Sequence, residues 1–126
     1  MKLLSCLCLS LLVAGCATGT REAPPVSIDE ARAKVPQTSP ECLAQNPKPG
    51  EPFPASAIPT EAMSKKQGGL VAMRYDVLAG VAQNIAVVAS TPPGLYDAAA
   101  LQHAAKYREP RGITVRGCIM TIEVKF

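Results

Sequence analysis

The sequence predicts an α+β fold: a three-stranded antiparallel sheet with two helices on one face, preceded by a signal peptide and a Pro-rich tether. Apolar and polar residues alternate over 70–78 and 113–126, as they do in strands that bury one face. Segments 55–67 and 95–107 are rich in helix-forming residues and are followed by glycine or proline. With the order helix, strand, strand, helix, strand, we expect both helices to cover one face and the other face to stay more open.

The first fifteen residues have the organisation of a signal peptide. A positive start at Met1-Lys2 precedes an apolar stretch, Leu3 to Val13, which is shorter than the about 20 residues that span a bilayer. Small residues then stand directly before Cys16, and this ending resembles the bacterial lipobox. The resemblance implies cleavage after Gly15, a lipid on Cys16 and stable anchoring by several acyl chains. An ordinary secretory signal with an incidental cysteine is the alternative.

The residue after the lipidated cysteine bears on which membrane holds the protein. In lipoproteins of enteric type, an Asp at this position retains the protein at the inner membrane, but here the residue is Ala17. We therefore expect an outer-membrane lipoprotein that faces the periplasm.

Residues 16–52 form the predicted tether, which is dominated by prolines and small or polar residues without a sustained apolar period. One short helix is expected over 27–34, with Ser27 as N-cap and Glu30 completing a capping box, and Pro36 would stop it. We expect little packing elsewhere, so the extended tether would reach about 110 Å at most.

Two cysteines remain for the mature fold, because Cys6 and Cys8 leave with the signal and Cys16 takes the lipid. In an oxidising periplasm Cys42 and Cys118 form a plausible disulfide, which would stabilise the fold by roughly 4 kcal/mol. Two unpaired or intermolecular thiols are the alternative. Their spacing suits neither a CxxC redox pair nor a zinc site, and we expect no metal and no cofactor.

The elements after residue 52 follow one another closely. The helix over 55–67 is closed by Gly68-Gly69, and the strand over 70–78 alternates its faces. A turn around Ala79-Gly80 leads to a hairpin partner over 84–90. The residues that we expect on the buried faces of the first and last strands are Val71, Met73, Tyr75 and Val77, and Cys118, Met120, Ile122, Val124 and Phe126.

This order of elements, over residues 53–126, resembles the TonB C-terminal domain. The pieces that carry the resemblance are Phe53-Pro54-Ala55-Ser56-Ala57, the strand Gly69 to Val77, Val87-Val88-Ala89-Ser90, the helix entry Leu95 to Leu101, Pro110, and Ile122 to Phe126. The sequence departs from the family at Tyr107, where Trp is frequent, at the slightly short loop to Pro110, and at 78–81, which lacks the Asp-Gly hairpin. Energy transducers of this family begin with an uncleaved transmembrane helix, through which a proton-driven motor in the inner membrane acts on them. This sequence begins with a predicted lipoprotein signal in place of that helix.

The resemblance implies that the outer edge of the last strand pairs with an extended segment of a periplasmic or outer-membrane protein, and that this pairing is associated with TonB-dependent transport. The edge residues that this implies are Ile113, Val115, Ile119, Thr121 and Glu123. Two alternatives stay open: the edge is covered or used in a homodimer, or the protein is a disulfide-stabilised structural lipoprotein of the envelope with no role in transport.

Other functional classes find little support. The sequence has thirteen Lys and Arg residues; Lys2 leaves with the signal, so the mature chain has twelve, against ten Asp and Glu residues. These charges are scattered and aromatic residues are few, a composition that does not favour nucleic-acid binding. His103 is the only histidine and is expected on a helix surface without a nucleophile or carboxylate partner. We expect no catalytic residues and no enzyme activity.

Overall fold

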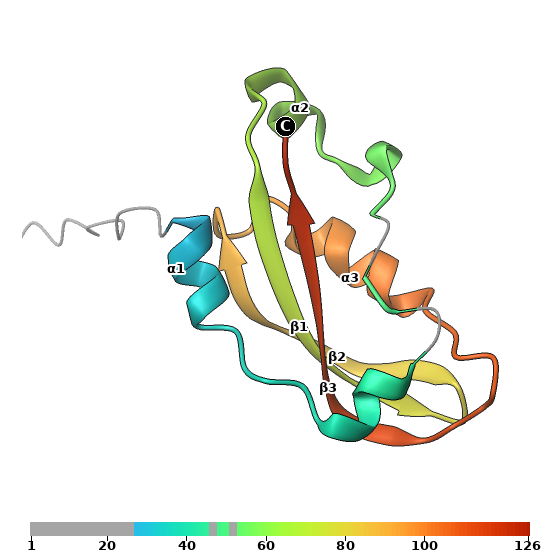
Figure 1. Cartoon of the computed structure of the whole chain (residues 1–126). Helices are drawn as coiled ribbons and strands as arrows, with labels where there is room; N and C mark the ends of the chain where they lie inside the picture. Colours follow the sequence, from blue (N-terminus) through green and yellow to red (C-terminus); the bar gives the residue numbers. More distant parts are fainter. Residues whose placement is uncertain (1–26, 46–47, 51–52) are drawn as a thin grey trace, which may run out of the picture.

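A computed structural model describes residues 27–45, 48–50 and 53–126. It confirms the α+β fold class: three antiparallel strands lie in the order β2-β1-β3 (Figure 1). The bounds are β1 Gly69–Leu78, β2 Val81–Thr91 and β3 Val115–Val124. Both β2 and β3 are therefore edge strands. The predictions for the signal peptide, for Cys16 and for Ala17 lie outside the described residues.

The hairpin between β1 and β2 closes through two residues. Ala79 and Gly80 have φ values of 50° and 81°, and a two-residue turn with two left-handed residues matches the twist of paired strands. Pairing continues up to this turn, where Leu78 faces Val81. For this reason β2 begins three residues before the expected 84.

One face of the sheet holds the main core, as the alternation in β1 predicts. The four expected residues of β1, from Val71 to Val77, are at most 1% exposed. Helix α3 (Asp97–Ala105) adds Ala100 and Ala104, and α2 (Thr60–Lys65) adds Ala62 to the same cluster. Because alanine side chains are small, α3 lies close to the strands on this face, whereas α2 lies at the end of the sheet near the C-terminus (Figure 1).

The single helix expected over 55–67 is divided in two. A 3-10 helix, η2, covers Ala55–Ala57, and α2 starts after Pro59. Proline has no amide hydrogen and disfavours a helical conformation of the residue before it; Ile58 is accordingly extended, with ψ 125°. Phe126, expected on the buried face of the last strand, lies beyond β3 and is 57% exposed.

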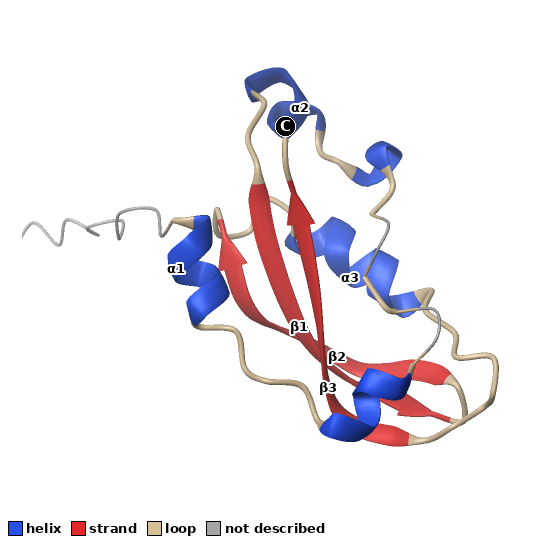
Figure 2. Cartoon of the chain, in the orientation of Figure 1, coloured by secondary structure: helices blue, strands red, loops and turns tan. Residues whose placement is uncertain are grey.

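Helix α1 (Ile28–Ala33) covers part of the opposite face, which we expected to be more open (Figure 2). Its predicted capping box is present: Glu30 N–H donates to Ser27 Oγ at 3.2 Å, and Ser27 N–H donates to Glu30 Oε2 at 3.1 Å. Ala31 is buried in a second cluster with Leu70 and Ala72. This face is thus covered by the region predicted to be tether.

Residues 35–45 and 48–50, which we call the strap, continue from α1 to β3. They include the 3-10 helix η1 (Pro40–Ala44), and Cys42 and Gln45 are buried. The expectation of little packing is therefore wrong for the described part of the predicted tether. Prolines prevent a regular helix or strand here, but single side chains still fill places against the sheet.

Within the described part of the chain, none of the helices has the length and apolar character that crossing a bilayer requires.

Candidate functional site: the outer edge of β3

Along β3, the backbone amide and carbonyl groups of successive residues point alternately toward β1 and toward the outer edge of the sheet. Ile119 N–H donates to Thr38 Oγ1 of the strap at 3.1 Å, so this amide points away from β1. Because a strand alternates, the amide and carbonyl groups of Thr121 and Glu123 point to the same outer edge. Three of the residues that we predicted for this edge thus share one direction.

The other two predicted edge residues lie differently. A register shift separates Tyr75 and Val77 on β1, and opposite it Gly117 has a φ of 71°. Val115 lies beyond this irregularity and faces Val77. Ile113 precedes β3, and its carbonyl accepts Gly80 N–H at 2.9 Å. The prediction of Ile113 as a strand residue is wrong because the chain there closes the hairpin end of the fold.

Asp76 holds this irregularity together. Its carboxylate accepts Gly117 N–H at 2.9 Å and the Asn84 side-chain amide at 3.0 Å. The bond from Gly117, followed by that from Asn84, holds the pKa of Asp76 below its usual value. Arg116 Nη1 lies 3.6 Å from Asp76 Oδ2. Asp76 therefore connects the central strand to both edge strands as a carboxylate.

The strap covers the middle of the β3 edge. Thr38 accepts the Ile119 amide, and Cys42 is bonded to Cys118. Gly50 lies so close that an added Cβ would stand 3.0 Å from the Thr121 carbonyl oxygen. A second strand could not pair with the edge from Cys118 to Thr121 without displacing the strap.

The cysteine pair is embedded in a buried polar cluster. Cys42 and Cys118 form the expected disulfide, with a Cα–Cα distance of 5.6 Å. Gln45 Nε2 donates to Cys118 Sγ at 3.2 Å, and the Tyr75 hydroxyl donates to Gln45 Oε1 at 2.8 Å. Burial raises the pKa of Tyr75 far above its usual value, so this phenol stays protonated. The strap is held by satisfied polar contacts as well as by the disulfide.

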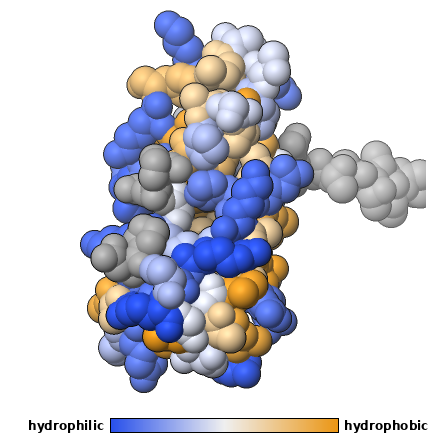
Figure 3. Space-filling model, turned by 90° about the vertical axis from the view of Figure 1, so that its right-hand side faces the viewer, coloured by the Kyte–Doolittle hydropathy of each residue, from blue (hydrophilic) through white to orange (hydrophobic). Residues whose placement is uncertain are grey.

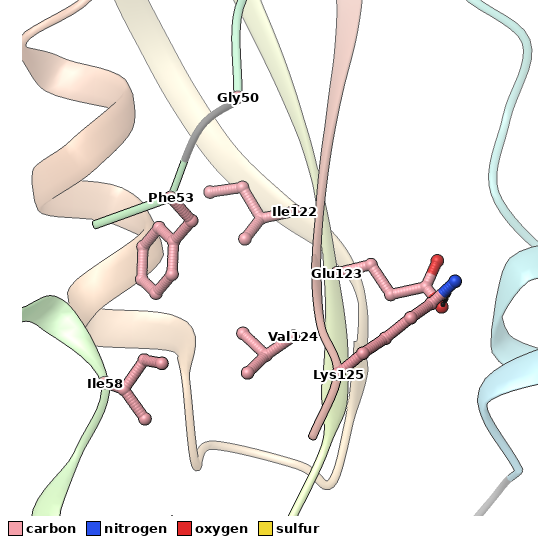
Figure 4. Close-up of a pocket in the computed structure, with 7 residues that line it drawn as sticks. All are labelled: Gly50, Phe53, Ile58, Ile122, Glu123, Val124 and Lys125. Atoms are coloured by element: carbon pink, nitrogen blue, oxygen red, sulfur yellow. Dashed lines mark ion pairs between the residues drawn. The ribbon is translucent and has the colours of Figure 1, made fainter. Parts of the chain in front are cut away.

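A pocket of about 500 Å³ lies at the far end of β3, and Gly50 at the end of the strap is one of the residues that line it (Figure 4). Phe53 and Ile58, from the segment before α2, point toward Ile122 and Val124 on β3. The Phe53 ring makes an edge contact with His103 of α3, with 5.4 Å between ring centroids. The pocket is thus apolar on its inner sides and bordered by the edge of β3.

The residues between these apolar side chains face the other way. Glu123 and Lys125 point to the opposite side of β3 (Figure 4). Glu123 Oε1 lies 2.7 Å from Arg32 Nη2 of α1 and 3.3 Å from Lys125 Nζ. An ion pair therefore connects α1 to the strand that borders the pocket.

The molecular surface on the right-hand side of Figure 1 mixes apolar and charged residues. Figure 3 shows this face without a broad hydrophobic area among its coloured residues. Recognition on this face would consequently depend on backbone pairing and a few side chains rather than on a large apolar contact.

The remaining titratable groups have structural partners. Burial, then the charge of Lys106, lowers the pKa of His103, so this ring is neutral near pH 7. The buried Glu109 carboxylate contacts Arg111 Nε at 2.5 Å and accepts its amide at 2.9 Å. In the residues that the structure describes, no three His, Cys, Asp or Glu side chains gather as a metal site would require.

No family model matches the sequence, and no curated protein matches it significantly. The resemblance to the TonB C-terminal domain therefore stays a prediction.

Sequence reasoning missed the strap and the pocket residues Phe53 and Ile58. One signal for the strap was available. If Cys42 pairs with Cys118, the chain around Cys42 must lie against the last strand.

Proposed function

We propose that the protein is a lipid-anchored cell-envelope protein that binds an extended segment of another protein at the outer edge of β3. One observation carries this proposal: β3 is an edge strand, and its last residues border an open pocket with apolar sides. An extended segment gains backbone hydrogen bonds along such an edge, while its alternate side chains enter pockets. This is the mode of binding that the resemblance to the TonB C-terminal domain implies.

The strap limits where such a segment can pair. The edge is covered as far as Thr121, so pairing would use Glu123 and the residues that follow. A volume of about 500 Å³ lies within the range of roughly 300–1,000 Å³ that is common for small-ligand pockets. We therefore expect a bound segment to place at least one large apolar side chain between Phe53, Ile58 and Val124.

The disulfide is consistent with an exported protein, because such bonds persist in oxidising compartments. Together with a lipid on Cys16, it supports a location in the cell envelope, and our preferred location is the outer membrane facing the periplasm. With a lipid in place of a motor-coupled helix, the proposed role is binding, in or near TonB-dependent transport, and not energy transduction or catalysis.

Site-specific photocrosslinking in cells tests the proposal. A photoreactive residue at Lys125 lies on the opposite face of β3 from the pocket, beside the alternate side chains of any segment that pairs with this edge. It should form an adduct with a partner protein, whereas the same residue at the exposed Arg108 should not. Ile58→Asp should abolish the Lys125 adduct because it puts a charge into the pocket, and Val88→Asp, on the far edge strand, should leave it intact. A Lys125 adduct that survives Ile58→Asp in folded protein contradicts pocket binding, and an adduct with a second copy of this chain indicates a homodimer.

A second candidate function follows from the strap itself. Because the strap covers β3 from Cys118 to Thr121 and is held by a disulfide, the domain also fits a structural role in the envelope. Cells that lack the protein but import siderophores and vitamin B12 normally would favour this candidate over a transport role.

A further inference from the structure

We propose that the partner of the β3 pocket is a segment of a protein held in the same membrane as the Cys16 lipid. The inference rests on the proposed function and names the class of partner. It follows from the length of chain between the anchor and the first packed residue, and from the place where that chain enters the fold.

The chain between lipid and fold is short. Ser27 caps α1, and α1 is fixed to the sheet by the buried Ala31 and by the ion pair between Arg32 and Glu123. Eleven residue steps separate Cys16 from Ser27. At no more than about 3.6 Å each, they span about 40 Å at most, well below the reach of a tether that extends to residue 52.

The pocket lies at the end of the sheet where the chain enters. An added Cβ at Gly68 would stand 3.6 Å from Ile28 Cδ1 of α1 and 2.7 Å from the carbonyl oxygen of Val124, which lines the pocket. Arg32 reaches Glu123 from the same helix. Figure 2 shows α1 beside the half of the sheet in which β3 ends. The short chain between Cys16 and Ser27 therefore limits how far the pocket, as well as α1, can lie from the membrane.

The small size of the open edge explains why a shared membrane is needed. Only residues after Thr121 extend beyond the part of the β3 edge that the strap covers. A segment bound there would bury far less than the roughly 1,200–2,000 Å² of a stable complex, so it would bind weakly in solution. Confining both proteins to one membrane raises their effective concentration, which can strengthen overall binding by about 10²–10⁴-fold without new contacts.

The experiment compares the Lys125 adduct in full-length variants that differ only near the anchor. Cys16→Ser, with residues 1–15 exchanged for the cleavable signal peptide of a soluble periplasmic protein so that no anchor remains, should lower adduct yield at least about tenfold at equal protein level. Ala17→Asp, which should move the anchor to the other membrane, is expected to lower it similarly, and Ala17→Ser is the matched control. A flexible insertion of about 60 residues after Arg21 in the Ala17→Asp protein should restore part of the yield.

The outcomes separate this inference from the proposed function. An adduct at wild-type yield in the Cys16→Ser protein overturns the inference, because binding would then not need the membrane. Membrane fractionation shows whether the Ala17→Asp protein is anchored in the other membrane. If it is, an unchanged yield of the Lys125 adduct also overturns the inference. If the wild-type protein forms no adduct that depends on Ile58, the proposed function itself fails.

Discussion

The two edge strands of the sheet are protected in different ways. The outer edge of β3 is covered by the strap, which is joined to it by the Cys42–Cys118 disulfide. β2 has a different feature: two register shifts against β1 each place one extra residue in β2, and Asn84 is left-handed at φ 54°. Exposed strand edges invite pairing with other chains, and both covers and bulges counter this. The strap covers the β3 edge as far as Thr121, and the part of the edge after Thr121 is where we propose that a partner binds.

Removing the disulfide should have the largest effect. The double variant Cys42→Ala/Cys118→Ala should lose roughly 2–5 kcal/mol of unfolding free energy, because the unfolded chain is no longer cross-linked. Urea unfolding measures this loss. In the double variant, the hydrogen-exchange rate of the Ile119 amide should increase more, relative to the wild type, than the rates of amides in the middle of β2. Equal acceleration in both edge strands would mean that the strap does not protect β3 specifically.

The bulge in β2 can be tested at Asn84. Asn84→Ala and Asn84→Gly both remove the hydrogen bond to Asp76, but only alanine is strained at a positive φ. The alanine variant should therefore be less stable than the glycine variant by about 1–2 kcal/mol in denaturant unfolding. Equal stabilities would contradict the left-handed conformation at this position.

A smaller effect is expected at the contact between strap and edge. Thr38→Val keeps the shape of the side chain but removes the acceptor for Ile119 N–H, so the unfolding free energy should fall by about 1 kcal/mol. Amide exchange at Ile119 should accelerate. Thr38→Ser keeps the hydroxyl and is the matched control, which should retain the slow exchange.

The pH dependence of stability should show the role of Asp76, which contacts both edges. Its pKa in the folded protein is lowered, first by the Gly117 amide and then by Asn84. The stabilisation is therefore complete above the unfolded-state pKa of about 4 and is lost as pH falls through the lower folded-state value. Urea unfolding at a series of pH values from 6 to 2 should show a shallower acid decline for Asp76→Asn than for the wild type. An identical slope would show that this carboxylate makes no difference to acid stability.

Local patterns account for most of the fold but not for the strap. The alternation from Val71 to Val77 and the capping box at Ser27 are confirmed because each depends on neighbours in the sequence. The division of the first predicted helix was foreseeable at Pro59, since proline acts on the residue before it. The strap has no periodicity, so its packing depends on contacts such as that between Thr38 and Ile119, which are 81 positions apart.

The candidate site was predictable in part for the same reason. Strand alternation placed the backbones of Ile119, Thr121 and Glu123 on one edge, but it could not show that the strap occupies part of that edge. The pocket depends on Phe53 and Ile58 meeting β3 across about 65 residues of chain, which no local pattern encodes.

The sequence by itself determined the strands, the third helix, the cap of α1 and the two cysteines available for a disulfide, because these follow from periodicity and residue chemistry over a few positions. Only the tertiary structure decided that α1 and the strap belong to the folded unit and that the described strap covers the β3 edge as far as Thr121. Those features arise where distant side chains fill the surface that the sheet leaves uncovered, and that surface exists only once the strands have paired.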